Sequence, residues 1–147
     1  FTDDEVISGQ GTVALEMIED EPDLDAIVVP VGGGGLISGI GVATKALGLN
    51  IKVIGVASNG ASAMANSFKH KKAESTKSVG TIADGIAVRD ASPITLEYIL
   101  QTVDSLKLVC EDEIAAAILY LLEKQKVLVE GAGSVGVAAL IHNKLDL

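Results

Sequence analysis

Four consecutive glycines, Gly32 to Gly35, are the residues whose type and spacing point most clearly to chemistry. They follow a short apolar run, Ala26 to Val31, and precede a helical pattern that begins near Leu36. Residues without Cβ let a chain turn tightly and bring its amides close to a ligand. The first amides of a helix also lack intrahelical acceptors and carry positive dipole charge. The stretch therefore predicts a phosphate cradle; the alternative is a glycine turn that only allows close packing.

A second glycine pattern, GxGxxG, occurs at Gly131 to Gly136 after a short apolar run. In a dinucleotide-binding fingerprint, an acidic residue follows about 20 positions later. The sequence reaches Leu147 before that distance. We therefore disfavour a Rossmann-type nucleotide site here and expect these glycines to admit a tightly packed helix from Ser134 to His142.

The reactive side chains suggest no catalytic set of their own. Cys110 follows apolar residues and has no histidine near it in sequence, so we expect a buried core thiol and not a nucleophile. His70 and His142 are far apart and are expected at the surface or at helix ends. Neither HExxH nor GxSxG is present, and no metal site is expected. A phosphate cradle without reactive groups suggests that the chemistry belongs to a cofactor.

The elements that would position this cradle indicate an α/β fold, with a mainly parallel sheet and flanking helices. A second apolar, β-branched run, Ile51 to Ala57, completes a right-handed βαβ unit with the first run and the helix between them. A third strand is expected from Leu106 to Cys110. Helices are expected from Asp3 to Ile18 with a break or a close contact near Gln10, from Leu36 to a stop at Gly48, from Ala61 to His70, from Pro93 to Thr102 with Ser92 as cap, and from Glu111 to Lys124. The segment from Lys72 to Ser92 has no clear period and is either functional or an ordinary connection.

Length and composition bound the remaining possibilities. A chain of 147 residues with 48% hydrophobic residues is expected to form a single domain, residues 1–147, with an aliphatic core. The net charge of −9 disfavours nonspecific binding to nucleic acid or to an anionic membrane, so the expected partner is a small molecule. The lone cysteine forms no internal disulfide and no apolar run is long enough to cross a bilayer, so we expect a cytoplasmic protein.

Four motifs in this order carry a resemblance to a known family. They are Ser8-Gly9-Gln10-Gly11-Thr12 after an acidic start, Pro30 to Leu36, Thr81-Ile82-Ala83-Asp84-Gly85, and Val129-Glu130-Gly131-Ala132-Gly133. Their order and approximate spacing resemble those of threonine ammonia-lyase (threonine dehydratase), a fold-type II enzyme that uses pyridoxal phosphate and is a close relative of serine racemase. Val56 to Asn59, with Met64 and Phe68, is more similar to the catabolic branch.

The resemblance implies a β-elimination that converts L-threonine to 2-oxobutanoate and ammonia, or L-serine to pyruvate, with pyridoxal 5'-phosphate as cofactor. It assigns the cofactor phosphate to the amides of Gly32, Gly33, Gly34, Gly35 and Leu36. Gly85 would lie beside the cofactor ring. Glu130 would either approach the site or serve as a structural acid. Serine racemases place a metal-binding acid where Ala57 stands, so that metal site is expected to be absent.

The chain also departs from the family pattern. The Schiff-base lysine of the family lies in a Ser-x-Lys-x-Arg motif, which is missing, and lysines such as Lys45 and Lys52 are expected at the surface. The Ser-x-Gly-Asn and Ser-Gly-Gly-Asn elements that contact the cofactor ring are missing too. We therefore interpret the chain as a fragment of the large domain of a homo-oligomeric enzyme, inactive alone and binding pyridoxal phosphate weakly through the phosphate only. The alternative is a stand-alone phosphate-ligand binding or regulatory module.

Overall fold

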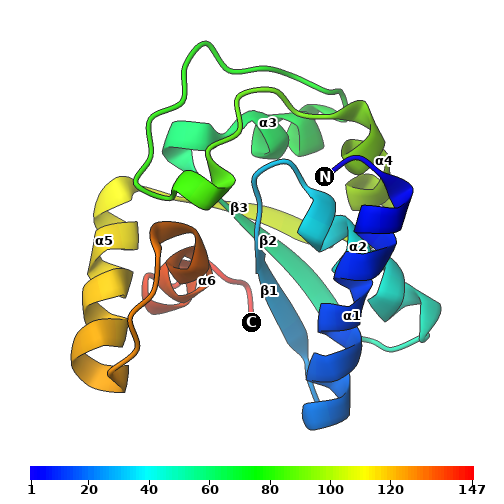
Figure 1. The fold of residues 1–147 in the computed structure, drawn as a ribbon, viewed down its shortest axis with the longest axis horizontal. Helices are drawn as coiled ribbons and strands as arrows, with labels where there is room; N and C mark the ends of the chain where they lie inside the picture. Colours follow the sequence, from blue (N-terminus) through cyan, green and yellow to red (C-terminus); the bar gives the residue numbers. More distant parts are fainter.

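Three parallel strands form the sheet of the computed structural model, which describes residues 1–147 (Figure 1). They are β1 (Ala26–Pro30), β2 (Lys52–Ser58) and β3 (Ser105–Val109), in the order β1-β2-β3. Six α-helices accompany them: α1 (Asp4–Asp20), α2 (Gly35–Ala46), α3 (Ala63–His70), α4 (Pro93–Thr102), α5 (Glu111–Tyr120) and α6 (Gly131–Ile141). Two 3₁₀ turns, η1 (Asn59–Ala61) and η2 (Asp84–Ile86), and a π turn, η3 (Leu121–Gln125), complete the elements. The predicted α/β class with a parallel sheet is confirmed.

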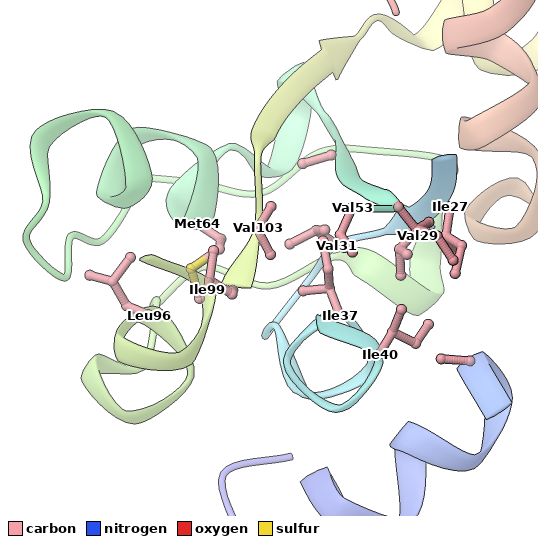
Figure 2. Packing of buried hydrophobic residues seen from close by; sticks show 13 residues of the cluster. Ile27, Val29, Val31, Ile37, Ile40, Val53, Met64, Leu96, Ile99 and Val103 are labelled. Atoms are coloured by element: carbon pink, nitrogen blue, oxygen red, sulfur yellow. The ribbon is translucent and has the colours of Figure 1, made fainter. Parts of the chain in front are cut away.

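The helices cover both faces of the sheet, with α1 and α2 on one side and α5 and α6 on the other (Figure 1). Because side chains alternate along a strand, Ile27 and Val29 of β1 belong to the core beneath α1, α2 and α4 (Figure 2). Val28, which lies between them, packs against the core formed with α5 and α6. This double coverage explains why β1 is apolar without polar alternation. None of the helices combines the length and the apolar character that crossing a membrane requires.

Several local predictions agree with the structure to within a residue or two. The amide of Val31 donates to the carbonyl of Val56 at 2.8 Å, which extends the strand pairing just past β1. The Ser92 hydroxyl caps α4 by accepting from the amide of Ile94 at 3.1 Å. Gly48 has a φ of 66°, the left-handed conformation that often ends a helix.

Two helix predictions require correction, those for α1 and α6. α1 is continuous, so the expected break near Gln10 is wrong. α6 begins at Gly131, three residues before the predicted start, so that Gly131 and Gly133 belong to the first turn of the helix. The helix predicted from Glu111 to Lys124 has the expected extent, because α5 ends at Tyr120 and continues as the π-helical turn η3 to Gln125.

The alternative expectation near Gln10, a close packing contact, is correct. A Cβ built on Gly39 of α2 would overlap the carbonyl oxygen of Ile7 and lie 2.7 Å from the amide nitrogen of Gly11. A Cβ built on Gly11 would lie 3.1 Å from the carbonyl oxygen of Gly39. The two glycines therefore allow α1 and α2 to pack backbone against backbone, which fixes the helix that follows the glycine turn.

The substitution Gly39→Ala is expected to lower the free energy of unfolding by about 1–3 kcal/mol, because the added methyl group meets backbone atoms of α1. Urea denaturation measures the change. Gly9→Ala is the control: Gly9 lies in α1 with no atom within 4 Å of a Cβ, so alanine should raise the stability by about 0.5–1 kcal/mol. Equal effects of the two substitutions would contradict the close helix packing.

Candidate functional site

A cavity of about 370 Å³ opens at the carboxyl ends of the strands. It brings together residues that are far apart in sequence: Gly32, Gly33, Gly34, Gly35, Leu36, Gly85 and Glu130. Phe1, Ile86 and Val88, which belong to none of the four motifs, also line it, as do the motif residues Pro30, Ala132 and Gly133, to which the sequence assigned no role in the site. In open parallel sheets, ligands bind in the crevice outside the carboxyl ends of the strands. The position of the cavity follows that rule.

The backbone amides of the glycine turn are free to bind an anion. From Gly32 to Leu36, no backbone N–H donates a hydrogen bond within the protein. The N-cap of α2 is Gly34, which makes no side-chain cap, and the first turn of this helix holds no acidic residue. These amides therefore line the cavity unpaired, at the positive end of the α2 dipole. An anion in the cavity would supply the missing acceptors.

Thr95 of α4 holds the turn in place from behind. Its hydroxyl donates to the carbonyl of Gly33 at 2.7 Å, and the Ser38 hydroxyl donates to the Thr95 carbonyl at 3.4 Å. Because the peptide bond is trans, the amide of Gly34 points away from the carbonyl that Thr95 binds. The contact spans 62 residues, so nothing in the local sequence indicates it.

The segment that contains η2 forms a second wall. A Cβ built on Gly32 would lie 2.9 Å from the Cα of Ile86, and one on Gly85 would lie 3.0 Å from the Cβ of Ala132. The segment is thus packed between the glycine turn and the start of α6. The contacts at positions 32 and 85 are too close for a larger residue to fit without a shift. The sequence allows two interpretations of residues 72–92, a functional segment or an ordinary connection. The structure favours a functional segment, because Gly85, Ile86 and Val88 line the cavity.

Two further residues complete the cavity. The Phe1 ring lies over the glycine turn, where a Cβ on Gly33 would approach its ring carbons to within about 2.5 Å. Glu130 is the exposed N-cap of α6, and its Oε1 lies 3.1 Å from the position of a Cβ on Gly85. The carboxylate therefore approaches the site, as one of its two interpretations required. No lysine or arginine lines the cavity, and Lys45 and Lys52 are exposed elsewhere.

The GxGxxG pattern, the cysteine and the two histidines form no second functional site. The GxGxxG glycines are part of α6, and no strand leads directly into that helix, so they do not form a nucleotide-binding turn. Cys110 is half-buried at the N-cap of α5, where its amide donates to Glu113 Oε2 at 2.7 Å. The prediction of a buried core thiol is therefore wrong. His70 and His142 are exposed, and no His, Cys, Asp or Glu side chains gather in a group that could hold a metal ion.

A parallel α/β sheet with an unpaired amide cradle at its carboxyl edge defines a class of proteins that bind phosphorylated ligands. Comparison with known proteins makes the class specific. A family model described as "Pyridoxal-phosphate dependent enzyme" matches residues 1–147, and the chain belongs to this family.

Its relatives confirm the resemblance noted from the motifs. The chain is 51% identical over 147 residues to an L-threonine ammonia-lyase of Thermotoga maritima, covering 100% of this chain and 36% of the relative. It is 44% identical over 146 residues to the catabolic L-threonine dehydratase TdcB of Escherichia coli K12, covering 99% and 44%. The chain thus spans less than half the length of these two relatives.

Solved structures agree with this assignment. The processed form of threonine deaminase isoform 2 from Solanum lycopersicum matches with a TM-score of 0.91 and 34% identity, covering 99% of this chain and 43% of that one. Maize serine racemase matches with a TM-score of 0.89 and 38% identity, covering 94% and 42%. The fold is therefore that of enzymes dependent on pyridoxal phosphate.

Proposed function

We propose that this chain is the phosphate-holding part of the large domain of a longer ammonia-lyase, which deaminates L-threonine, and L-serine as a related substrate. The observation that carries the proposal is the row of unpaired amides from Gly32 to Leu36 on the cavity wall. The names of the relatives support the reaction, and the share of their length that the chain spans supports a longer enzyme.

The residues present fit pyridoxal phosphate. The amides of Gly32 to Leu36 would hold the phosphate, and Gly85 with Ile86 would provide a flat wall for the ring. Gly35 has no room for a side chain, because a Cβ there would lie 2.8 Å from the Phe1 carbonyl oxygen. When bound, the cofactor supplies an electron sink for the carbanion that loss of the substrate α-proton leaves. This chain's own residues bind and orient it.

Charge supports a specific role for the backbone. The chain carries a net charge of −9, and Glu130 is the only charged side chain that lines the cavity. A phosphate is therefore held here against the overall field, by local N–H groups and the N-terminus of α2. Because these donors are fixed in the fold, we expect affinity for the phosphate but little for anions that cannot fill the turn.

The cavity lining lacks the side chains that the proposed reaction needs. None of the lining residues is a lysine, so nothing in the cavity can bond covalently to the cofactor aldehyde. None is a hydroxyl-bearing or amide side chain that could bind the substrate carboxylate or the pyridine nitrogen. We place those groups, and the contacts of a homo-oligomer, in the rest of the longer enzyme.

The test is to sequence the coding region on both sides of Phe1 and Leu147 and to express the polypeptide that it encodes. We expect a Ser-x-Lys-x-Arg motif upstream, a Ser-Gly-Gly-Asn-like segment downstream, and 2-oxobutanoate production from L-threonine. A start codon directly before Phe1, or a longer polypeptide that binds pyridoxal phosphate without deaminating threonine or serine, would overturn the proposal. Either result would favour the stand-alone binding module.

A further inference from the structure

Glu111 binds three segments of the chain together at the carboxyl edge of the sheet. It is the first residue of α5, and only Cys110 separates it from the end of β3. Its Oε1 accepts from the Ser58 hydroxyl at the end of β2 at 2.7 Å, and its Oε2 accepts from the amide of Ile82 at 2.7 Å. The Thr81 side chain is a further hydrogen-bond partner of the carboxylate.

The bonding partners of this carboxylate are neutral, and it forms no salt bridge. Burial raises the pKa of Glu111, but hydrogen bonds from Ile82, Thr81 and Ser58 lower it by more, so that the pKa lies below its ordinary value. The side chain is therefore ionised at neutral pH, and it accepts charge-assisted hydrogen bonds, which are stronger than neutral ones. Its place in the first turn of α5 adds favourable dipole energy.

The segment bound by Glu111 has few other anchors. Between residues 77 and 88, only two hydrogen-bonded partners lie outside the segment: Gly60, whose carbonyl accepts from Gly80 at 3.0 Å, and Glu111. The rest are local bonds, such as the one from the Ala83 amide to the Thr81 hydroxyl at 3.1 Å. Of these two partners, the Glu111 carboxylate is the one that binds the connection where it enters the cavity wall.

The segment that Glu111 binds, residues 81–86, contacts the glycine turn. Ala83 and Ile86 are buried within the core shared with α5 and α6. The Ile86 backbone abuts Gly32, and Gly85 abuts the start of α6, so that the segment supports the cradle from one side. Glu111 itself does not line the cavity and would not touch a ligand in it.

We propose that Glu111 is a positioning residue, whose carboxylate fixes residues 81–86 as the supporting wall of the cofactor cavity. The inference rests on the proposed function for the identity of the ligand, and on the hydrogen bonds alone for the hold on the segment. Since the acceptor atoms carry this role, a side chain of similar length that lacks them should lose the hold on the segment, and one that keeps a single acceptor should retain part of it.

The test compares Glu111→Met, which keeps the length without acceptors, with Glu111→Gln, which keeps an amide oxygen. Asp112→Asn is the matched control, because Asp112 is exposed on the same turn of α5 and has no bonded partner. Amide hydrogen exchange of the ligand-free 147-residue chain measures the hold on residues 82–86. Titration of the same variants with pyridoxal phosphate measures the effect on the cavity.

We expect Glu111→Met to speed exchange at residues 82–86 by at least about tenfold, while amides of β1 and α1 keep their wild-type rates. The affinity for pyridoxal phosphate should fall by at least about threefold. Asp112→Asn should stay within about twofold of wild type in both measurements. Glu111→Gln, which keeps one acceptor oxygen but loses the charge, should show a smaller loss than Glu111→Met in both measurements.

Wild-type exchange at residues 82–86 in Glu111→Met would overturn the proposal, and so would faster exchange with unchanged affinity. Equal losses in Glu111→Met and Glu111→Gln would assign the effect to charge and not to the acceptor atoms, which also contradicts it. If the wild-type chain binds no pyridoxal phosphate, the proposed function fails, but the exchange measurement still decides whether Glu111 holds the segment.

Discussion

The purified 147-residue chain, supplied with pyridoxal phosphate and L-threonine, is expected to produce 2-oxobutanoate no faster than pyridoxal phosphate does alone. Enzymes accelerate their reactions by at least about a millionfold, and the chain should show none of this acceleration. The physical reason is the composition of the cavity, which holds a phosphate cradle, apolar walls and the Glu130 carboxylate, but no lysine that could bond to the cofactor aldehyde and no histidine or hydroxyl side chain. Positioning a cofactor at its phosphate does not move a proton at its reacting end.

The measurement is a coupled assay that detects 2-oxobutanoate. The longer polypeptide from the same coding region is the positive control, and free cofactor at the same concentration is the baseline. Turnover above this baseline by the chain alone would show that a catalytic base lies within residues 1–147, and the account of the cavity would then be wrong.

The second large effect is expected at Gly34, whose φ of 91° only glycine adopts without strain. In Gly34→Ala, a left-handed conformation costs about 1–2 kcal/mol, and the new Cβ lies 2.8 Å from Ile99 Cδ1 and 3.1 Å from Thr95 Oγ1. The turn should therefore shift, break the bond from Thr95 to the Gly33 carbonyl and misdirect the free amides. We expect the affinity for pyridoxal phosphate to fall by at least about tenfold, measured by titration.

Gly48→Ala separates this effect from backbone strain in general. Gly48 has a φ of 66°, and no atom lies within 4 Å of a Cβ built there. The variant should lose about 1 kcal/mol of stability, with unchanged cofactor affinity, because Gly48 lies at the far end of α2 from the cavity. Similar losses of affinity in the two variants would mean that the cradle geometry is not what binds the phosphate.

The strand–turn–helix unit around the cradle was predictable because its signals are local. The apolar run from Ala26, the four glycines and the helical pattern after them each specify the conformation of a few neighbouring residues. The same holds for Ser92 as the cap of α4 and for Gly48 as the stop after α2, where one residue type has one preferred backbone role. The family motifs added Gly85, which no local pattern selects.

The errors arose where tertiary contacts decide local structure. Gly9 and Gly11 lower helix propensity, yet α1 is continuous, because Gly11 packs on Gly39 and the contact offsets the cost. At Gly131, the first residue of α6, the carbonyl of Ile82 and the Cα of Ala83 leave no room for a side chain, a contact that the local sequence does not reveal.

The supporting residues of the site were invisible for a related reason. Thr95 meets the glycine turn across 62 residues, and Glu111 meets Ile82 across 29. A threonine in a helix and a glutamate at a helix start are each ordinary locally, so only the fold reveals their partners. Phe1 likewise acquires its meaning from the glycines over which it packs.

Titration of the 147-residue chain with pyridoxal phosphate, with unphosphorylated pyridoxal and with a nicotinamide dinucleotide tests most directly whether the glycine turn binds the cofactor phosphate. If the free amides of Gly32 to Leu36 hold the phosphate, pyridoxal phosphate binds, pyridoxal binds at least about tenfold more weakly, and the dinucleotide does not compete. Pyridoxal binding as tightly as its phosphate, or a dinucleotide binding more tightly than either, would contradict the claim.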